Sequence, residues 1–92
     1  MVTRQGRPPQ DNSYETTEIK LAAVILSTIP DSTFEVYSQD NSTKKVVRVI
    51  YSSNYEQEVN KLMREFIERQ ARVDVYKYNM ALNMLRDRIK RE

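Results

Sequence analysis

The sequence of 92 residues contains no histidine, no cysteine and a single glycine, Gly6. Without imidazole or thiol groups, the chain has no histidine acid or base, no thiolate nucleophile and no Cys/His zinc cluster, and the Tyr, Lys, Ser, Thr and carboxylate side chains that it does contain show no arrangement with a base or an orienting group. One glycine cannot build a P-loop or a dinucleotide-binding turn, because both need several glycines where the backbone approaches a phosphate. We therefore expect a protein that acts by binding and is not an enzyme, with no cofactor, no metal site and no small-molecule substrate.

The length predicts one domain with a thin stability margin. A chain of 92 residues buries only about 60–65% of the surface that its unfolded form exposes. It has no disulfide or Cys/His metal site, so oligomerisation or docking on a larger partner is the remaining source of stability. No apolar run approaches the roughly 18 residues that cross a bilayer, and the polar N-terminus lacks the apolar core of a secretory signal. The absence of cysteine fits a reducing compartment, so we expect a cytoplasmic protein without a membrane partner.

The chain divides into an N-terminal arm and one folded domain. Residues 1–15 are rich in proline and polar side chains and contain almost nothing apolar, which predicts a flexible arm. Apolar periodicity begins directly after the arm, so we expect residues 16–92 to form a single α+β domain.

Residues 17–28 have the spacing of a helix that Thr16 or Thr17 can cap and that ends before Pro30. Apolar side chains cover nearly every face of this helix, which makes it either central in the fold or shared with a partner chain. Methionines further along the chain either fill the core or pack at such an interface. The expected oligomer interface comprises Leu21, Val24, Ile25, Met80 and Met84.

The middle of the chain predicts two antiparallel strands. Residues 34–37 alternate, residues 39–43 form a polar turn cluster, and residues 45–51 are a β-branched run, which together are typical of a β-hairpin. Two strands alone are barely stable in water. We therefore expect the hairpin to lie against helices, with edges that can pair with a second copy.

Two helices are predicted after the hairpin. Ser53 and Glu56 have the S-x-x-E spacing of a capping box, and apolar residues from Val59 to Ile67 follow with helical spacing. Asp74 is a suitable N-cap for a last helix. The predicted fold is therefore α+β: a helix, a two-stranded antiparallel β-hairpin and two C-terminal helices, preceded by the flexible arm.

Three stretches of the chain are similar to a known family: Leu21-Ala22-Ala23, Val46 to Tyr51, and Val73-Asp74 through Ala81-Leu82. With the order of elements, they resemble a family of small phage and bacterial domains of unknown function, over about residues 14–90. The resemblance implies a phage or mobile-element setting, and hence a host cytoplasm. It implies no activity, because the family has no established one.

Positive charge is concentrated toward the C-terminus. The net charge is +2, and the isoelectric point is near 9.0, which weakly favours a polyanionic partner. The stretch from Arg86 to Arg91 can contact phosphates without sequence choice. Its alternative role is to complement the helix dipole and to keep the end of the chain soluble.

Two further segments have features of nucleic-acid binding. Residues 4–9 resemble the Gly-Arg-Pro core of AT-hook segments, which enter the minor groove of A·T-rich DNA; the alternatives are a flexible tail and an arm that reaches a neighbouring subunit. Tyr37 and Tyr51 offer faces on which bases stack, and their alternative is a structural role. The candidate nucleic-acid-binding residues are Arg4, Arg7, Lys44, Lys45, Arg48, Arg86, Arg88, Lys90 and Arg91.

Two functions fit these features. The first is a small accessory binding protein of phage or mobile-element type that contacts DNA or RNA through the basic C-terminal helix and the arm. The alternative is a protein-interaction module, such as a host-factor inhibitor or a structural subunit of a larger assembly, with no nucleic-acid role. In both cases the expected protein partner is a second copy of the chain, in a homo-oligomer, or a larger protein.

Overall fold

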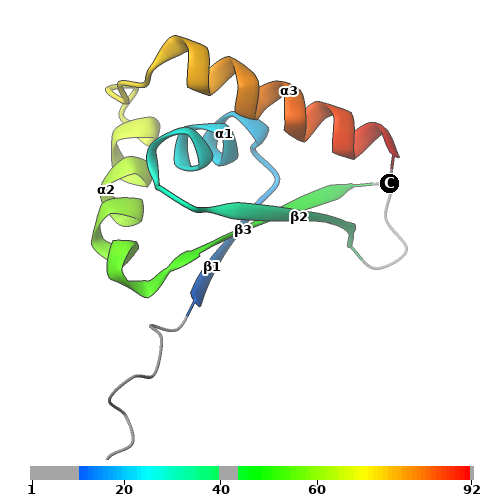
Figure 1. Cartoon of the computed structure of the whole chain (residues 1–92), viewed down its shortest axis with the longest axis horizontal. Helices are drawn as coiled ribbons and strands as arrows, with labels where there is room; N and C mark the ends of the chain where they lie inside the picture. Colours follow the sequence, from blue (N-terminus) through cyan, green and yellow to red (C-terminus); the bar gives the residue numbers. More distant parts are fainter. Residues whose placement is uncertain (1–10, 40–43, 92) are drawn as a thin grey trace, which may run out of the picture.

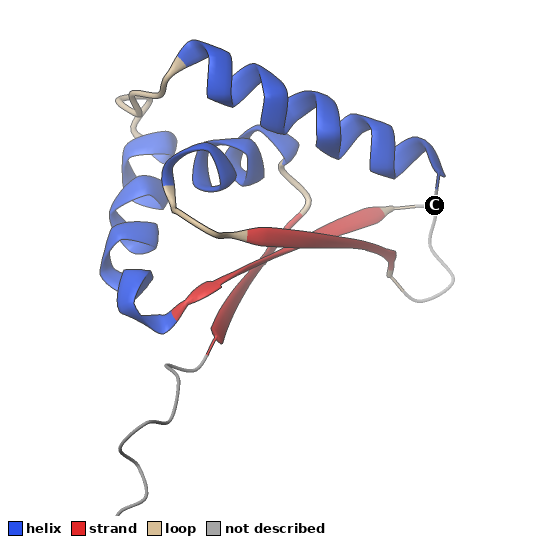
Figure 2. Ribbon diagram, viewed as in Figure 1, coloured by secondary structure: helices blue, strands red, loops and turns tan. Residues whose placement is uncertain are grey.

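In the computed structural model, which describes residues 11–39 and 44–91, three helices lie on one side of a three-stranded antiparallel sheet (Figure 1 and Figure 2). The α+β class, both strands of the hairpin and the three helices agree with the sequence prediction. The elements in chain order are β1 (Asp11–Thr16), α1 (Ile19–Thr28), β2 (Thr33–Ser38), β3 (Lys45–Ser52), a 3₁₀ turn (Ser53–Tyr55), α2 (Glu56–Ile67) and α3 (Val75–Arg91).

β3 is the central strand, in the order β1-β3-β2, and pairs antiparallel with both neighbours. Its β-branched and aromatic residues suit a strand that is paired on two sides. Alternation turns Val47, Val49 and Tyr51 toward the helices, where their exposed fractions are 1%, 0% and 3%. The same alternation turns Arg48 to the opposite face of the sheet.

Part of the predicted arm is a strand, so the two-stranded prediction is incomplete. Residues Asp11–Thr16 form β1, in register from Asp11 opposite Ser52 to Thr16 opposite Val47. The sequence conceals this strand because an edge strand needs apolar side chains on one face only, and Tyr14 is the residue of β1 that packs against the core. The remaining residues of the predicted arm, 1–10, lie outside the described residues.

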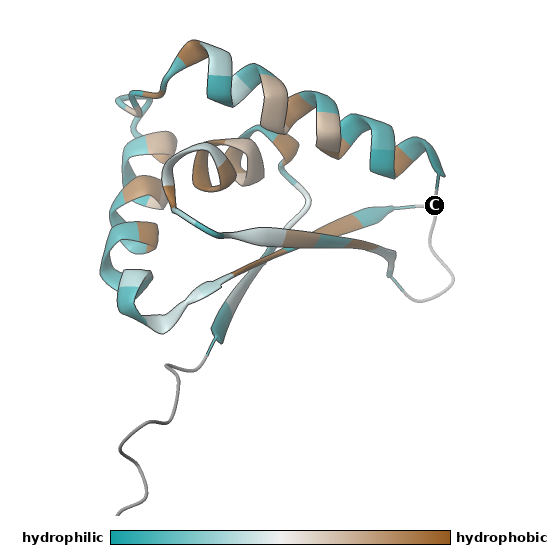
Figure 3. Cartoon of the chain, in the orientation of Figure 1, coloured by the Kyte–Doolittle hydropathy of each residue, from teal (hydrophilic) through white to brown (hydrophobic). Residues whose placement is uncertain are grey.

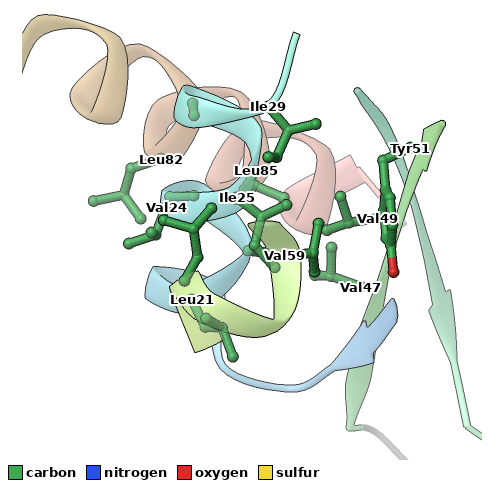
Figure 4. Close-up of a cluster of buried hydrophobic side chains, with 14 of the residues drawn as sticks. Leu21, Val24, Ile25, Ile29, Val47, Val49, Tyr51, Val59, Leu82 and Leu85 are labelled. Atoms are coloured by element: carbon green, nitrogen blue, oxygen red, sulfur yellow. The ribbon is translucent and has the colours of Figure 1, made fainter. Parts of the chain in front are cut away.

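The core forms where α1 lies between β3 and the other two helices (Figure 4). Five successive residues of α1, from Leu21 to Ile25, are at most 5% exposed. Figure 3 shows that apolar residues run through α1 and alternate with polar ones along α3. The expectation that Leu21, Val24 and Ile25 need cover from a second chain is therefore wrong, because the chain's own strand and helices enclose them.

The helices end without glycine, because Gly6 is the only glycine of the chain. At the end of α2, the Gln70 N–H donates to the Glu65 carbonyl at 2.7 Å and the Arg69 N–H to the Phe66 carbonyl at 3.0 Å. These two bonds form a Schellman motif. The motif places Arg69 in the left-handed region, at φ 61°, where glycine is the usual residue.

One of the two predicted caps of the C-terminal helices is confirmed. At the start of α3, the Lys77 N–H donates to Asp74 Oδ1 at 3.0 Å. The capping box at Ser53 and Glu56 is wrong, because a 3₁₀ turn precedes α2 and the hydroxyl of Ser52 accepts a backbone N–H there instead. The Glu56 carboxylate is thereby left to bond to the sheet.

Replacing Arg69 by glycine should raise the free energy of unfolding by up to about 1 kcal/mol, because it removes the steric cost of a side chain in the left-handed region. Arg72→Gly is the matched control, since Arg72 lies in the same connection and its φ is not positive. Glycine relieves no strain there, so this variant should be no more stable than the wild type. Thermal unfolding followed by circular dichroism measures both, and a lower midpoint for R69G than for R72G would contradict the assignment.

Candidate functional site

One side of α3 carries two exposed methionines. Helical spacing places Ala81, Leu82 and Leu85 in the core. Met80 and Met84 lie one turn apart beside this buried stripe, and they are 48% and 52% exposed. Two large apolar side chains on adjacent turns are therefore accessible to a ligand.

The methionines line a groove between α3, the end of α1 and the start of β2. Its volume is about 430 Å³, and its apolar lining is Leu26 of α1, Phe34 of β2, and Met80, Ala81 and Met84 of α3. The groove exists because α3 packs mainly on α1 rather than on β2. Its volume lies within the range of about 300–1,000 Å³ that is typical of ligand sites.

Among the described residues that line the groove, the two charged ones are cations, Lys77 and Arg88. They are eleven positions apart on α3, which corresponds to about 16 Å along the helix. The guanidinium carbon of Arg88 lies 5.3 Å from the centre of the Phe34 ring, so a cation–π contact holds this arginine across the groove. The groove therefore has an apolar centre, hydroxyl groups from Ser27, Ser32 and Thr33 in its lining, and a cation toward each end of its α3 side.

The face of the sheet that points away from the helices is organised around Arg48. Its Nη2 and Nε atoms lie 2.7 and 2.9 Å from Glu15 Oε2, and its Nη1 lies 3.5 Å from Glu35 Oε1. The Tyr37 hydroxyl donates to the same Glu15 oxygen at 2.7 Å. The hydrogen bonds from Tyr37 and from Arg48 hold the pKa of Glu15 below its ordinary value. Two carboxylates surround one guanidinium, so their negative charge offsets the positive charge that Arg48 brings to this face.

The candidate nucleic-acid-binding residues do not form one surface. Arg48 lies on the far face of the sheet and is paired with carboxylates, whereas the C-terminal cations lie on α3. Arg91 pairs with Asp87 at 2.7 Å, and Arg88 lines the groove. The cations in the last turns of α3 are Arg86, Arg88, Lys90 and Arg91.

The other four candidates lie at the start of β3 or outside the described residues. Lys44 precedes β3 and Lys45 begins it. Lys45 Nζ donates to Ser38 Oγ across the strand pair, at 2.8 Å. Arg4 and Arg7 lie outside the described residues, so the structure does not place the predicted minor-groove arm.

Tyr51, a candidate for base stacking, is buried in the core. Its hydroxyl donates to Glu56 Oε1 at 2.8 Å, and Asn12 Nδ2 donates to the same oxygen at 2.7 Å. Burial, followed by the hydrogen bond to Glu56, raises the pKa of Tyr51 to about 12. The hydrogen bonds from Tyr51 and Asn12 in turn lower the pKa of Glu56. The carboxylate joins β1 and β3 to the start of α2, which is a structural role.

The groove brings Met80 and Met84, both predicted interface residues, together with residues that sequence reasoning missed. Leu26 and Phe34 are ordinary apolar residues of predicted elements, and only the packing of α3 on α1 places them beside the methionines. Lys77 could have been found, because it begins an i, i+3, i+7, i+11 row along α3 that contains both methionines.

The Glu56→Gln variant should weaken the acid dependence of stability. A carboxylate whose pKa is lower in the native than in the unfolded state stabilises the fold. This stabilisation is complete above the pKa of the unfolded state, ordinarily 4.5, and is lost as the pH falls through the pKa of the native state. The wild-type chain should therefore lose unfolding free energy as the pH falls below 4.5, and the glutamine variant should lose less.

Tyr51→Phe keeps the carboxylate but removes the hydroxyl that lowers its pKa most, so its acid dependence should be intermediate. Urea unfolding at several pH values between about 3 and 7 measures these slopes through the linkage of protonation to stability. Equal slopes for the wild type and both variants would contradict the role of the Glu56 carboxylate.

Among the described residues, no group of three or more His, Cys, Asp or Glu side chains is placed to hold a metal ion. Within the same ranges, no helix combines the length and the apolar character that a membrane span requires. No protein-family model, curated protein or solved structure matches the chain. The resemblance to phage and bacterial domains therefore stays a prediction, and the groove is interpreted from its own geometry.

Proposed function

We propose that the protein is a non-enzymatic protein-interaction module whose groove between α3 and β2 binds an acidic, apolar segment of another protein. The observation that carries the proposal is the pair of exposed methionines in a groove whose charged residues are cations. The apolar lining supplies affinity by removing surface from water. The charges supply orientation and selectivity.

The apolar contacts should contribute more to binding than the ion pairs. Complete burial of a methionine side chain is worth about 1.5–3 kcal/mol. Met80 and Met84 are about half exposed. Burial of the exposed half by a ligand therefore contributes on the order of 1 kcal/mol of binding free energy for each methionine. An exposed ion pair with Lys77 or Arg88 contributes about 0.2–1 kcal/mol. Substitution of the methionines should therefore weaken binding more than removal of the cations.

Charge favours a different protein over a second copy of this chain. Two copies that meet symmetrically at this groove bring the same cations, Lys77 and Arg88, toward each other, and like charges oppose association. Residues 1–10 of the chain contain Arg4 and Arg7 and no acidic residue, so they do not complement the groove either. A partner segment with carboxylates at its ends and apolar side chains between them complements both features.

A second candidate function, nucleic-acid binding by an accessory protein of phage or mobile-element type, is supported by the end of α3. The last six residues of this helix include four exposed cations, Arg86, Arg88, Lys90 and Arg91. Such side chains bind the phosphates of a nucleic acid independently of its base sequence. The contacts of Arg91 with Asp87 and of Arg88 with the Phe34 ring occupy two of them, so this candidate stands second.

Two displayed peptide libraries test the protein-interaction proposal. Each has twelve positions of mixed apolar and small polar residues, with Asp and Glu as the charged residues of one library and Lys and Arg of the other. Selection on the wild-type chain should enrich the acidic library only. The selected peptides should lose about tenfold or more in affinity for the Met80→Ser/Met84→Ser variant, which corresponds to about 1.4 kcal/mol.

The Asn79→Ser/Asn83→Ser variant is the matched control, because both side chains are exposed on α3 and neither lines the groove. It should bind the peptides as the wild type does. If neither library is enriched, or if the selected peptides bind the methionine variant equally well, the proposal is wrong.

A labelled single strand of twenty nucleotides tests the second candidate. If the end of α3 binds phosphates, the affinity should fall steeply as salt concentration rises. Replacement of Arg86, Arg88, Lys90 and Arg91 by glutamine should then remove most of the binding. Full affinity in this fourfold variant would dismiss nucleic-acid binding through α3.

A further inference from the structure

Building on the proposed function, we infer that the acidic segment binds as an extended strand that is added to the free edge of β2, beside the methionines of α3. The inference rests on three observations: the position of β2 in the sheet, the direction of its backbone groups, and the spacing of side chains along α3. It deepens the proposal above by naming the conformation of the ligand and the pattern of its side chains.

β2 is an edge strand. The pattern of hydrogen bonds between β2 and β3 shows which backbone groups of β2 do not bond to β3. The Gln39 N–H donates to the Lys44 carbonyl at 3.3 Å, and this pair continues the register of β2 with β3. Hydrogen-bonded pairs alternate along an antiparallel ladder, so Tyr37 and every second residue before it bond to β3. Phe34 and Val36 therefore direct their N–H and C=O groups away from β3.

The free edge of β2 begins at the groove. Thr33 and Phe34, the first residues of β2, belong to the groove lining. Figure 1 shows that β2 and α3 both run lengthwise through the molecule. A segment laid between them meets backbone donors and acceptors on one side and the methionines on the other. This combination is the general mode of strand addition, in which the backbone supplies affinity and alternate side chains supply specificity.

The spacing along α3 matches a strand. Met80 and Met84 are separated by about 6 Å along the helix, and residues i and i+2 of a strand are separated by about 6.6 Å. The distance of about 16 Å from Lys77 to Arg88 corresponds to five residues of a strand, and long cationic side chains reach a sixth. The inferred ligand pattern is acid-x-apolar-x-apolar-x-acid. A helical ligand parallel to α3 would instead need its acids about eleven positions apart.

A nine-residue probe peptide tests the inference. It has glutamate at its second and eighth positions, valine at its fourth, leucine at its sixth and threonine or serine elsewhere. Alternate N–H groups of an added strand point to the strand that it joins. Two further probes carry one N-methyl group each, on the fourth or on the fifth residue. One of the two should bind at least tenfold more weakly than the unmethylated peptide, and the other less than twofold more weakly.

Amide hydrogen exchange of the full chain gives an independent measurement. Saturation with the unmethylated probe should slow exchange at Phe34 and Val36 at least tenfold, because their N–H groups gain partners. Tyr37 is the internal control, because its N–H already faces β3 and should change little.

The outcomes separate the two proposals. If acid-flanked peptides bind and need Met80 and Met84, but both methylated probes bind alike or the two edge amides do not slow, strand addition is overturned and the proposed function stands. The same holds if only peptides with acids eleven positions apart bind. If no acidic peptide binds, both proposals fail. Concentration-dependent dimerisation that slows Phe34 and Val36 without the probe would assign the edge to a second copy, and would also overturn the inference.

Discussion

Five successive side chains of α1, from Leu21 to Ile25, are buried on every side, and the positions of the other elements follow from this. An apolar helix of ten residues must be covered all round, because each exposed Leu or Ile would forgo about 1.5–3 kcal/mol. β3 covers one side, and α2 and α3 cover the rest. α3 thus rests on another helix, at the usual interaxial distance of about 8–10 Å, and does not close onto β2. The groove is a consequence of the burial of α1.

The elements that depend on strong local patterns were predictable from the sequence. β3 is a β-branched run, α2 has a clear helical period, and Asp74 caps α3 as expected. β1 was not predictable, because a polar edge strand is defined by its pairing with β3 and not by its own pattern. An all-round apolar α1 has the same sequence pattern whether a partner or the chain's own helices cover it. Long-range contacts decide between the two.

The candidate site was predictable only in part, for the same reason. Met80 and Met84 were expected at an interface from their residue type, but the proximity of Phe34 to them depends on how α3 crosses α1. The pairing of Arg48 with Glu15 was missed for the same reason as β1. Once Glu15 is assigned to an arm, nothing in the sequence indicates that it lies beside Arg48 and neutralises it.

The distribution of charge separates the two faces of the protein. On the far face of the sheet, Glu15 and Glu35 surround Arg48 and pair with it. In the groove, the cations Lys77 and Arg88 lie among apolar side chains. A net charge of only +2 therefore conceals a local concentration of positive charge in the groove, which depends on the fold and not on composition.

The scarcity of glycine has a consequence for the denatured ensemble. A chain of this length and average composition would contain about six glycines, and this one has a single glycine that precedes β1. Each position at which another residue replaces glycine restricts the denatured backbone, and this raises the free energy of unfolding by about 0.4–1 kcal/mol. Within residues 11–39 and 44–91, the cost of replacing glycine appears at two turns, where Asp31 and Arg69 adopt positive φ at about 1–2 kcal/mol each. A domain with few residues to bury thus begins folding with less entropy to lose.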